Sequence, residues 1–193
     1  EISPAALAVA RRNAERHGVA ERVRLLAGDL LSPCPGPVDL IVSNPPYVST
    51  GERASLPASV REYEPSLALD GGSDGLDVVR RLLAQAPAVL AAPQPASGAC
   101  VVAWASGPTV VGGHRPTGMG GLAGAGPEAD RGAVAEGACP ELAEGRPGGA
   151  LLIEIGAGQG EAAANLARTF FPQATVRVLP DLAGRDRVLE IQT

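Results

Sequence analysis

The stretch Val38-Asp39-Leu40-Ile41-Val42-Ser43-Asn44-Pro45-Pro46-Tyr47 decides the fold of this chain. Its first six residues are largely apolar, which is typical of a strand buried within a parallel sheet. Asn44 follows at the carboxyl end of that strand, and ligands of open α/β sheets bind just beyond such ends. Pro45 and Pro46 have fixed φ angles and no N–H group, so the turn is stiff. The stretch therefore predicts an α/β domain with a preorganised site at the edge of its sheet.

The chemistry of this turn suits a planar nitrogen. The Asn44 side-chain oxygen and the Pro45 carbonyl can accept the two hydrogens of an sp² –NH₂ group, while the Tyr47 ring covers its flat face and Pro46 keeps the turn rigid. An amide nitrogen is a poor nucleophile, so positioning must supply the rate. We assign Asn44 and Pro45 as catalytic, and all four residues as substrate-binding. The alternative is an ordinary turn, which its place after a buried strand disfavours.

The rest of the chain alternates helical and extended patterns. Ser3 is a helix cap followed by proline, and the helical spacing continues to Gly18. Further helices are predicted for residues 76–90 and 161–171, and further strands for residues 23–26, 151–155, 175–179 and 187–191. This alternation predicts a Rossmann-like α/β fold.

Several blocks of sequence are shared with one enzyme family. They are Glu1-Ile2-Ser3-Pro4, Gly28-Asp29-Leu30, Asn44-Pro45-Pro46-Tyr47, Glu64-Pro65-Ser66-Leu67-Ala68-Leu69-Asp70-Gly71-Gly72, Leu151-Leu152-Ile153-Glu154-Ile155-Gly156, Gln159-Gly160-Glu161 and Asp181-Leu182-Ala183-Gly184-Arg185-Asp186-Arg187. In these blocks the chain resembles the release-factor glutamine methyltransferases (HemK/PrmC family), which are class I S-adenosylmethionine-dependent methyltransferases. The tetrapeptide alone is shared with DNA and RNA amino-methyltransferases, whereas the block at residues 64–72 is narrower and favours the glutamine enzymes.

The resemblance implies a cofactor, a substrate and roles for particular residues. S-adenosylmethionine would be held by Glu1 on the ribose hydroxyls, by Asp29 and Leu30 at the adenine end, and by Asn44. Without the family, Glu1 reads as a carboxylate at a helix N-terminus and Asp29 as a turn residue. The protein substrate would be a peptide chain release factor, methylated on the glutamine of its Gly-Gly-Gln loop. The long polar segment 49–75 would form the wall of the glutamine pocket.

Two departures from the family limit this expectation. The resemblance implies that the chain starts at the end of the family's second strand, so we expect it to lack the first strand, the glycine-rich loop and most of the second strand. The strand at Val23 then lacks the neighbours that bridge it to the strand at Val38, so its backbone groups must be solvated or rearranged. We therefore expect this polypeptide alone to bind the cofactor poorly. The second departure is the Gly-, Ala- and Pro-rich stretch 94–147, which divides a core of residues 1–93 and 148–193 and is expected to be disordered.

Composition fits a monomeric cytoplasmic enzyme of one domain. The chain has 193 residues and a formal net charge of -5, with no apolar run long enough for a membrane span and no basic field that predicts direct nucleic-acid binding. Cys34, Cys100 and Cys139 show no C-x-x-C spacing, and the two histidines lack the company of a catalytic triad or metal site. We predict no bound metal.

Three other interpretations stay open. The tetrapeptide also suits a nucleobase (adenine) amino-methyltransferase that flips a base into the pocket. A fragment without the cofactor loop could instead be a non-catalytic module. Finally, residues 151–160 form a strand leading into Gly-x-Gly-x-Gly, with Asp181 about twenty residues later, as in a nucleotide fingerprint. We treat this as a minority interpretation because Asp181 is followed by a turn and a strand, not by a helix.

Overall fold

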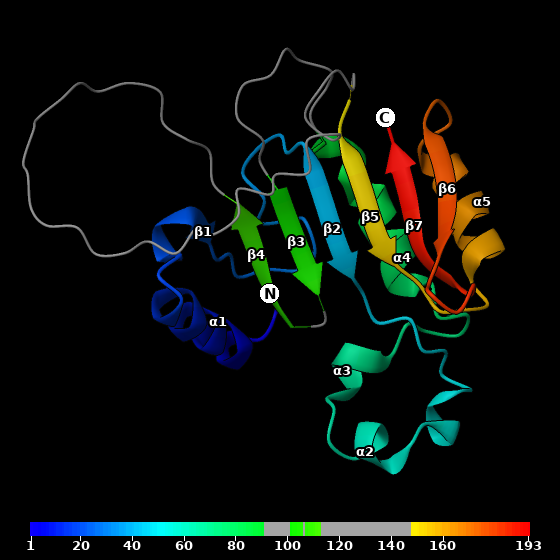
Figure 1. The fold of residues 1–193 in the computed structure, drawn as a ribbon, viewed down its shortest axis with the longest axis horizontal. Helices are drawn as coiled ribbons and strands as arrows, with labels where there is room; N and C mark the ends of the chain where they lie inside the picture. The colour runs from blue at the N-terminus through cyan, green and yellow to red at the C-terminus, as the bar shows by residue number, and fades with distance from the viewer. Residues whose placement is uncertain (91–100, 106, 113–147) are drawn as a thin grey trace, which may run out of the picture.

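A computed structural model describes residues 1–90, 101–105, 107–112 and 148–193 (Figure 1). Its centre is a seven-stranded sheet with the order β1-β4-β3-β2-β5-β7-β6. The strands are β1 (Val23–Arg24), β2 (Leu40–Asn44), β3 (Val101–Ala105), β4 (Gly107–Gly112), β5 (Ala150–Glu154), β6 (Thr175–Pro180) and β7 (Asp186–Gln192). Helices accompany the sheet, so the predicted α/β class is confirmed.

The directions of the strands create one functional edge. β2 is parallel to β3 and to β5, whereas β4 and β7 run antiparallel to their neighbours. The carboxyl ends of β1, β2, β3, β5 and β6 therefore lie at the same edge. Asn44, the last residue of β2, stands at this edge, where ligands of α/β sheets bind.

The longer helices follow the predicted pattern. In α1 (Pro4–Arg16) the Ser3 side chain caps the helix by accepting from the N–H of Ala6, 3.3 Å away. Helix α4 (Asp77–Gln85) ends earlier than residue 90 and continues as the short 3₁₀ helix η3 (Ala86–Ala88). Pro87 explains the difference because it has no N–H to donate to the preceding turn. Helix α5 (Gly160–Phe170) agrees with the prediction within one residue at each end.

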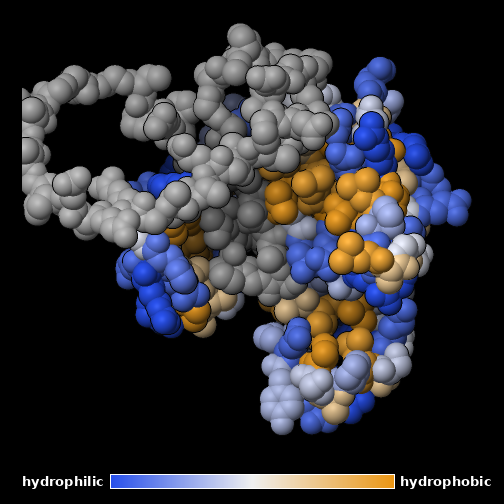
Figure 2. Space-filling view, viewed as in Figure 1, coloured by the Kyte–Doolittle hydropathy of each residue, from blue (hydrophilic) through white to orange (hydrophobic). Residues whose placement is uncertain are grey.

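The core lies between one face of the sheet and helices α4 and α5. On this face Ile41, Leu151 and Leu189 are fully buried against a cluster that includes Leu82 and Ala163. Burial alternates along β2 and β5, so only one face of each strand is fully buried. The face turned to the viewer carries half-buried apolar residues, which gather over the middle of the sheet in Figure 2. The strand predicted before the tetrapeptide is present as β2, parallel to both of its neighbours, with one of its two faces fully buried.

Two strands come from the stretch predicted as an insertion. β3 and β4 form an antiparallel pair that fills the sheet between β1 and β2. They supply the bridging neighbours that the sequence alone did not identify, so the backbone is rearranged rather than left unpaired. Residues 101–105 and 107–112 belong to the stretch 94–147 that the sequence predicts to be a disordered insertion, and the rest of that stretch lies outside the described residues.

The segment after the tetrapeptide is a loop closed at its neck. Val48 and Asp70 form an isolated bridge, with the Val48 N–H donating to Leu69 and the Gly71 N–H donating to Val48 at 3.0 and 2.8 Å. The enclosed residues 49–69, called here the closed loop, contain η2 (Arg53–Ser55), α2 (Ala58–Arg61) and α3 (Ser66–Leu69). In Figure 1 this loop hangs beyond the carboxyl edge of the sheet.

No helix in the described ranges is long and apolar enough to cross a membrane.

Candidate functional site

The tetrapeptide lies directly beyond β2 at the carboxyl edge. Asn44 ends the strand, beside Ala105 of β3. Pro45 and Pro46 are buried, and Tyr47 is half-buried. The two rigid, buried prolines fix the turn that presents Tyr47, as the sequence predicted.

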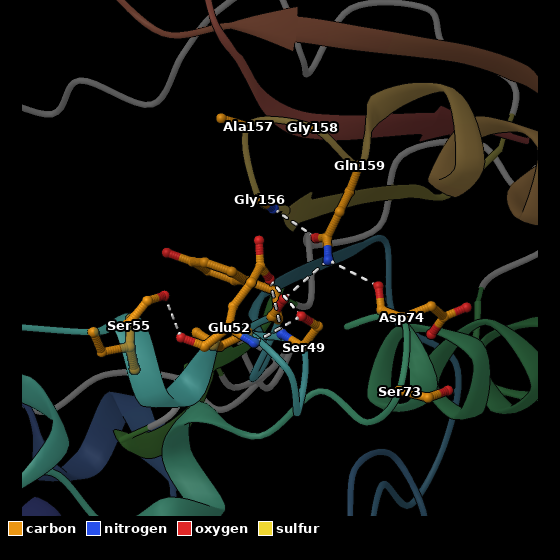
Figure 3. A pocket seen from close by; sticks show the side chains of 12 residues that line it. Ser49, Glu52, Ser55, Ser73, Asp74, Gly156, Ala157, Gly158 and Gln159 are labelled. Carbon is orange, nitrogen blue, oxygen red and sulfur yellow. Dashed lines mark hydrogen bonds between the residues drawn. The ribbon is translucent and has the colours of Figure 1, made fainter.

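A cavity of about 640 Å³ opens beside Tyr47 and is shown in Figure 3. Its wall has three parts, which are the start of the closed loop, the turn before α4 and the loop between β5 and α5. The lining residues are Tyr47, Val48, Ser49, Glu52, Ser55, Leu56, Ser73, Asp74, Gly156, Ala157, Gly158 and Gln159. Asn44, Pro45 and Pro46 do not line it themselves; they stand immediately before the residue that does.

Gln159 ties the three walls together. Its amide nitrogen donates to the carbonyl oxygens of Tyr47, at 2.9 Å, and of Asp74, at 3.3 Å. Its amide oxygen accepts from the N–H of Gly156 at 2.8 Å. Gly75 packs against this junction with a φ of 76°, and a Cβ there would collide with the Gln159 amide and the Tyr47 carbonyl. Only glycine suits such a position without strain.

This arrangement bears on the glycine loop 156–160. A nucleotide-binding loop presents its backbone N–H groups to phosphates, but the N–H of Gly156 is occupied by the side chain of Gln159. The Asp181 carboxylate accepts from the N–H groups of Ala183 and Arg185, at 2.8 and 3.0 Å, within its own turn. Both features favour a structural role for this block.

The hydroxyl of Tyr47 is held from β5. It donates to the Glu154 carboxylate at 3.3 Å, and Arg187 lies 3.7 Å from the same oxygen. Burial raises the pKa of Tyr47, and the negative charge of Glu154 raises it further. The phenol is therefore a hydrogen-bond donor at neutral pH and not a base.

The residues assigned to the cofactor lie at the same edge but apart from this cavity. Glu1 is buried, with one carboxylate oxygen accepting from the N–H of Ser3 at 2.7 Å. Its carbonyl accepts from the N–H of Gly28 at 3.1 Å, which brings it close to Asp29. The Asp29 carboxylate pairs with Arg81, and Leu30 is buried in the core with a φ of 51°.

These residues fit S-adenosylmethionine in part. The ordered carboxylate of Glu1 at a strand edge is the acceptor that ribose hydroxyls require. To bind the cofactor, the Asp29 carboxylate would have to leave its ion pair with Arg81. Leu30 could contact the cofactor only through its backbone, because its side chain is in the core. The structure groups Glu1 with Asp29 and Leu30, and it places Asn44 with Tyr47. Their joint role as a cofactor site stays a prediction.

Sequence reasoning gave no role to Glu154 and Gln159. Glu154 is the one charged residue in the apolar run 151–155, and a lone charge at the end of a buried strand was the available signal. Gln159 had no such signal, since the glycines around it directed attention to the backbone of the loop.

Comparison with known proteins supports the family resemblance. Residues 1–60 match the family model described as "Methyltransferase small domain". The chain is 39% identical over 188 residues to release factor glutamine methyltransferase of Moorella thermoacetica, covering 97% of this chain and 47% of the relative. It is 38% identical over 189 residues to the enzyme of the same name from Cereibacter sphaeroides, covering 98% and 48%.

A ribosomal protein uL3 glutamine methyltransferase from Bradyrhizobium diazoefficiens is 54% identical over 88 residues, which is 45% of this chain and 27% of that relative. The chain spans about half the length of the first two relatives. Along nearly its whole length it is similar to the release factor glutamine methyltransferases, so the predicted resemblance to that family is confirmed.

Proposed function

We propose that this chain carries the methyl-transfer site of an enzyme that methylates the side-chain amide nitrogen of a glutamine in a protein. The observation that carries the proposal is the buried, proline-fixed turn of the tetrapeptide at the carboxyl edge of β2, with Tyr47 opening onto a cavity. The relatives named above for release factors and for uL3 all act, by their names, on glutamine.

The tetrapeptide would prepare the amide for attack. Asn44 and Pro45 accept its two hydrogens and so fix the plane of the –NH₂ group, while the Tyr47 ring covers one face. S-adenosylmethionine, when bound, supplies the electrophilic methyl group. Holding the nitrogen in line with that group replaces the nucleophilicity that the amide lacks. No described side chain is needed as a base, because the cavity is open and the proton can leave to water after transfer.

Glu1, Asp29 and Leu30 would hold the ribose and adenine ends of the cofactor. Glu1 is the member of this group whose carboxylate is already oriented, by the N–H of Ser3. A monomer in the cytoplasm is the setting that we propose for the enzyme.

The substrate would be a peptide chain release factor, presented through its Gly-Gly-Gln loop. The cavity is of a size that accepts a few residues of extended chain. Its lining is close to evenly divided between polar and apolar surface, so it can accept both the backbone groups of such a loop and the aliphatic stem of a glutamine. A second candidate is the ribosomal protein uL3, favoured by the 54% identity of the relative that bears its name.

The decisive experiment is methyl transfer from labelled S-adenosylmethionine by the protein that contains this chain. Release factor, uL3 and a DNA duplex are offered in parallel, and the modified residue is identified by mass spectrometry. We expect the label on a glutamine of the release factor, and a loss of at least about a hundredfold in Asn44→Ala. Tyr63→Phe is the control, since Tyr63 is 83% exposed on the closed loop. Label on the DNA, or full activity in Asn44→Ala, would overturn the proposal.

A further inference from the structure

Two atoms of Tyr47, its hydroxyl and its carbonyl oxygen, are hydrogen-bonded to one segment of the chain that is distant in sequence. Glu154 accepts from its hydroxyl at 3.3 Å, and Gln159 donates to its carbonyl at 2.9 Å. These partners are 107 and 112 residues away in sequence, yet they flank the same short loop between β5 and α5. Residues 150–193 thus control both the side chain and the backbone of Tyr47.

Glu154 is itself held in place. The neighbouring Ile155 N–H donates to the Arg187 carbonyl at 2.9 Å, which fixes the end of β5 against β7. The Arg187 guanidinium lies 3.7 Å from Glu154 and 3.7 Å from Asp181. Asp181 accepts two backbone N–H groups in its own turn, so the series Asp181, Arg187, Glu154, Tyr47 is anchored at its far end.

Gln159 has a geometry that no isostere reproduces. Its amide nitrogen donates hydrogen bonds to two carbonyl oxygens, and its amide oxygen accepts one from a backbone N–H. A glutamate would keep the acceptor but lose both donated bonds, and its charge would face two carbonyl oxygens. A Cβ at position 75 would collide with the Gln159 amide and with the Tyr47 carbonyl oxygen, so this junction leaves no space for a side chain at Gly75.

We propose that Glu154 and Gln159 are positioning residues for Tyr47, Glu154 setting the direction of its ring through the hydroxyl and Gln159 fixing its backbone. The use made of the ring, to cover the target amide, rests on the proposed function; the positioning itself does not. The guanidinium of Arg187 lies 3.7 Å from the Glu154 carboxylate and helps to orient it toward the Tyr47 hydroxyl.

A titration of Tyr47 tests the positioning without any assay of activity. The chain has two tyrosines, and Tyr63→Phe leaves Tyr47 as the only phenol. The absorbance of tyrosinate then reports the pKa of Tyr47 alone. Because Glu154 is the largest cause of the raised pKa after burial, Glu154→Gln should lower the midpoint by about half a unit or more. Glu190→Gln is the matched control, since Glu190 lies on β7 and pairs with Arg177.

Methyl transfer supplies the second readout. Glu154→Ala and Gln159→Glu should each lower kcat/KM about tenfold, whereas Glu154→Gln, which keeps an acceptor for the Tyr47 hydroxyl, should retain most of it. Circular dichroism verifies folding in each variant.

An unchanged Tyr47 midpoint in Glu154→Gln would overturn the role of Glu154 even where methyl transfer occurs. A shifted midpoint in a protein that methylates no glutamine would leave the positioning intact and refute the proposed function. Equal activity in Gln159→Glu and the parent would overturn the role of Gln159.

Discussion

At the scale of single residues, Tyr47 combines an apolar ring with a hydroxyl whose partner is known. Tyr47→Phe removes the bond to Glu154 and keeps the ring, so we expect kcat/KM to fall by about three- to tenfold. Tyr47→Ala also removes the surface that covers the amide, and we expect a further loss of about tenfold or more. Steady-state kinetics of methyl transfer measures both. Equal losses in the two variants would show that the hydroxyl, and not the ring, carries the effect.

Gly75 is a second residue whose backbone conformation and close neighbours require glycine. Its φ of 76° is in the left-handed region, and a Cβ would meet the Tyr47 carbonyl and the Gln159 amide. Gly75→Ala should therefore lower the free energy of unfolding by about 1–2 kcal/mol from the backbone alone, with more from the disturbed hydrogen bonds. Urea unfolding measures this change. Gly51→Ala is the control because a Cβ there has no atom within 4 Å, and a similar loss in both variants would contradict the explanation.

At the scale of elements, the closed loop depends on its neck. Asp70 accepts from the Gly72 N–H at 3.0 Å and pairs with Arg53 at 3.0 Å. These contacts, the Gly72 bond first and Arg53 after it, hold the pKa of Asp70 below its ordinary range. A depressed folded-state pKa stabilises the neck above the ordinary pKa of about 4, and this contribution is lost as the pH falls through the folded-state value.

Asp70→Asn at neutral pH should imitate that loss. We expect faster hydrogen exchange at the amides of Val48 and Gly71, which close the neck, and unchanged exchange in β5 and β7. In the unmodified chain the same two amides should lose protection, relative to their intrinsic rates, as the pH is lowered below about 4. Protection at the neck that is insensitive both to the substitution and to acid would show that the backbone bonds alone close the loop.

Local patterns predicted most elements because they depend on nearby residues. The cap at Ser3 and the apolar run at residues 151–155 are set within a few positions, so α1 and β5 were found nearly to the residue, whereas α4 ends at Gln85, before the predicted residue 90. The tetrapeptide was found for the same reason. The partners of Tyr47 were not, because hydrogen bonds that span 107 and 112 residues leave no periodic trace. The place of β3 and β4 depends on their pairing with β2 and β1, which is a property of the whole sheet and not of residues 101–112 alone.

At the scale of the whole molecule, the sheet is continuous only through β3 and β4. β3 pairs with β2 over its full length, from Leu40 beside Val101 to Asn44 beside Ala105. The strand that ends in the functional turn is therefore supported on one side by β5 and on the other by β3. A change in β3 should reach the tetrapeptide through the backbone of β2.

Val102→Pro tests this continuity. Val102 is paired with Ile41 of β2 and with Val111 of β4, so its N–H belongs to a ladder on one side or the other, and proline removes it. An acceptor left unpaired within the sheet costs about 1–3 kcal/mol, and thermal unfolding should show a lower Tm. Val102→Thr keeps the N–H and a β-branched side chain, and its Tm should remain close to that of the parent.

Because β2 ends at Asn44, the proline variant should also speed hydrogen exchange at the amides of β2 more than at those of β6. A proline variant as stable and as protected as the threonine variant would mean that residues 101–112 do not support the sheet, and that the turn carrying Tyr47 is held by β5 alone.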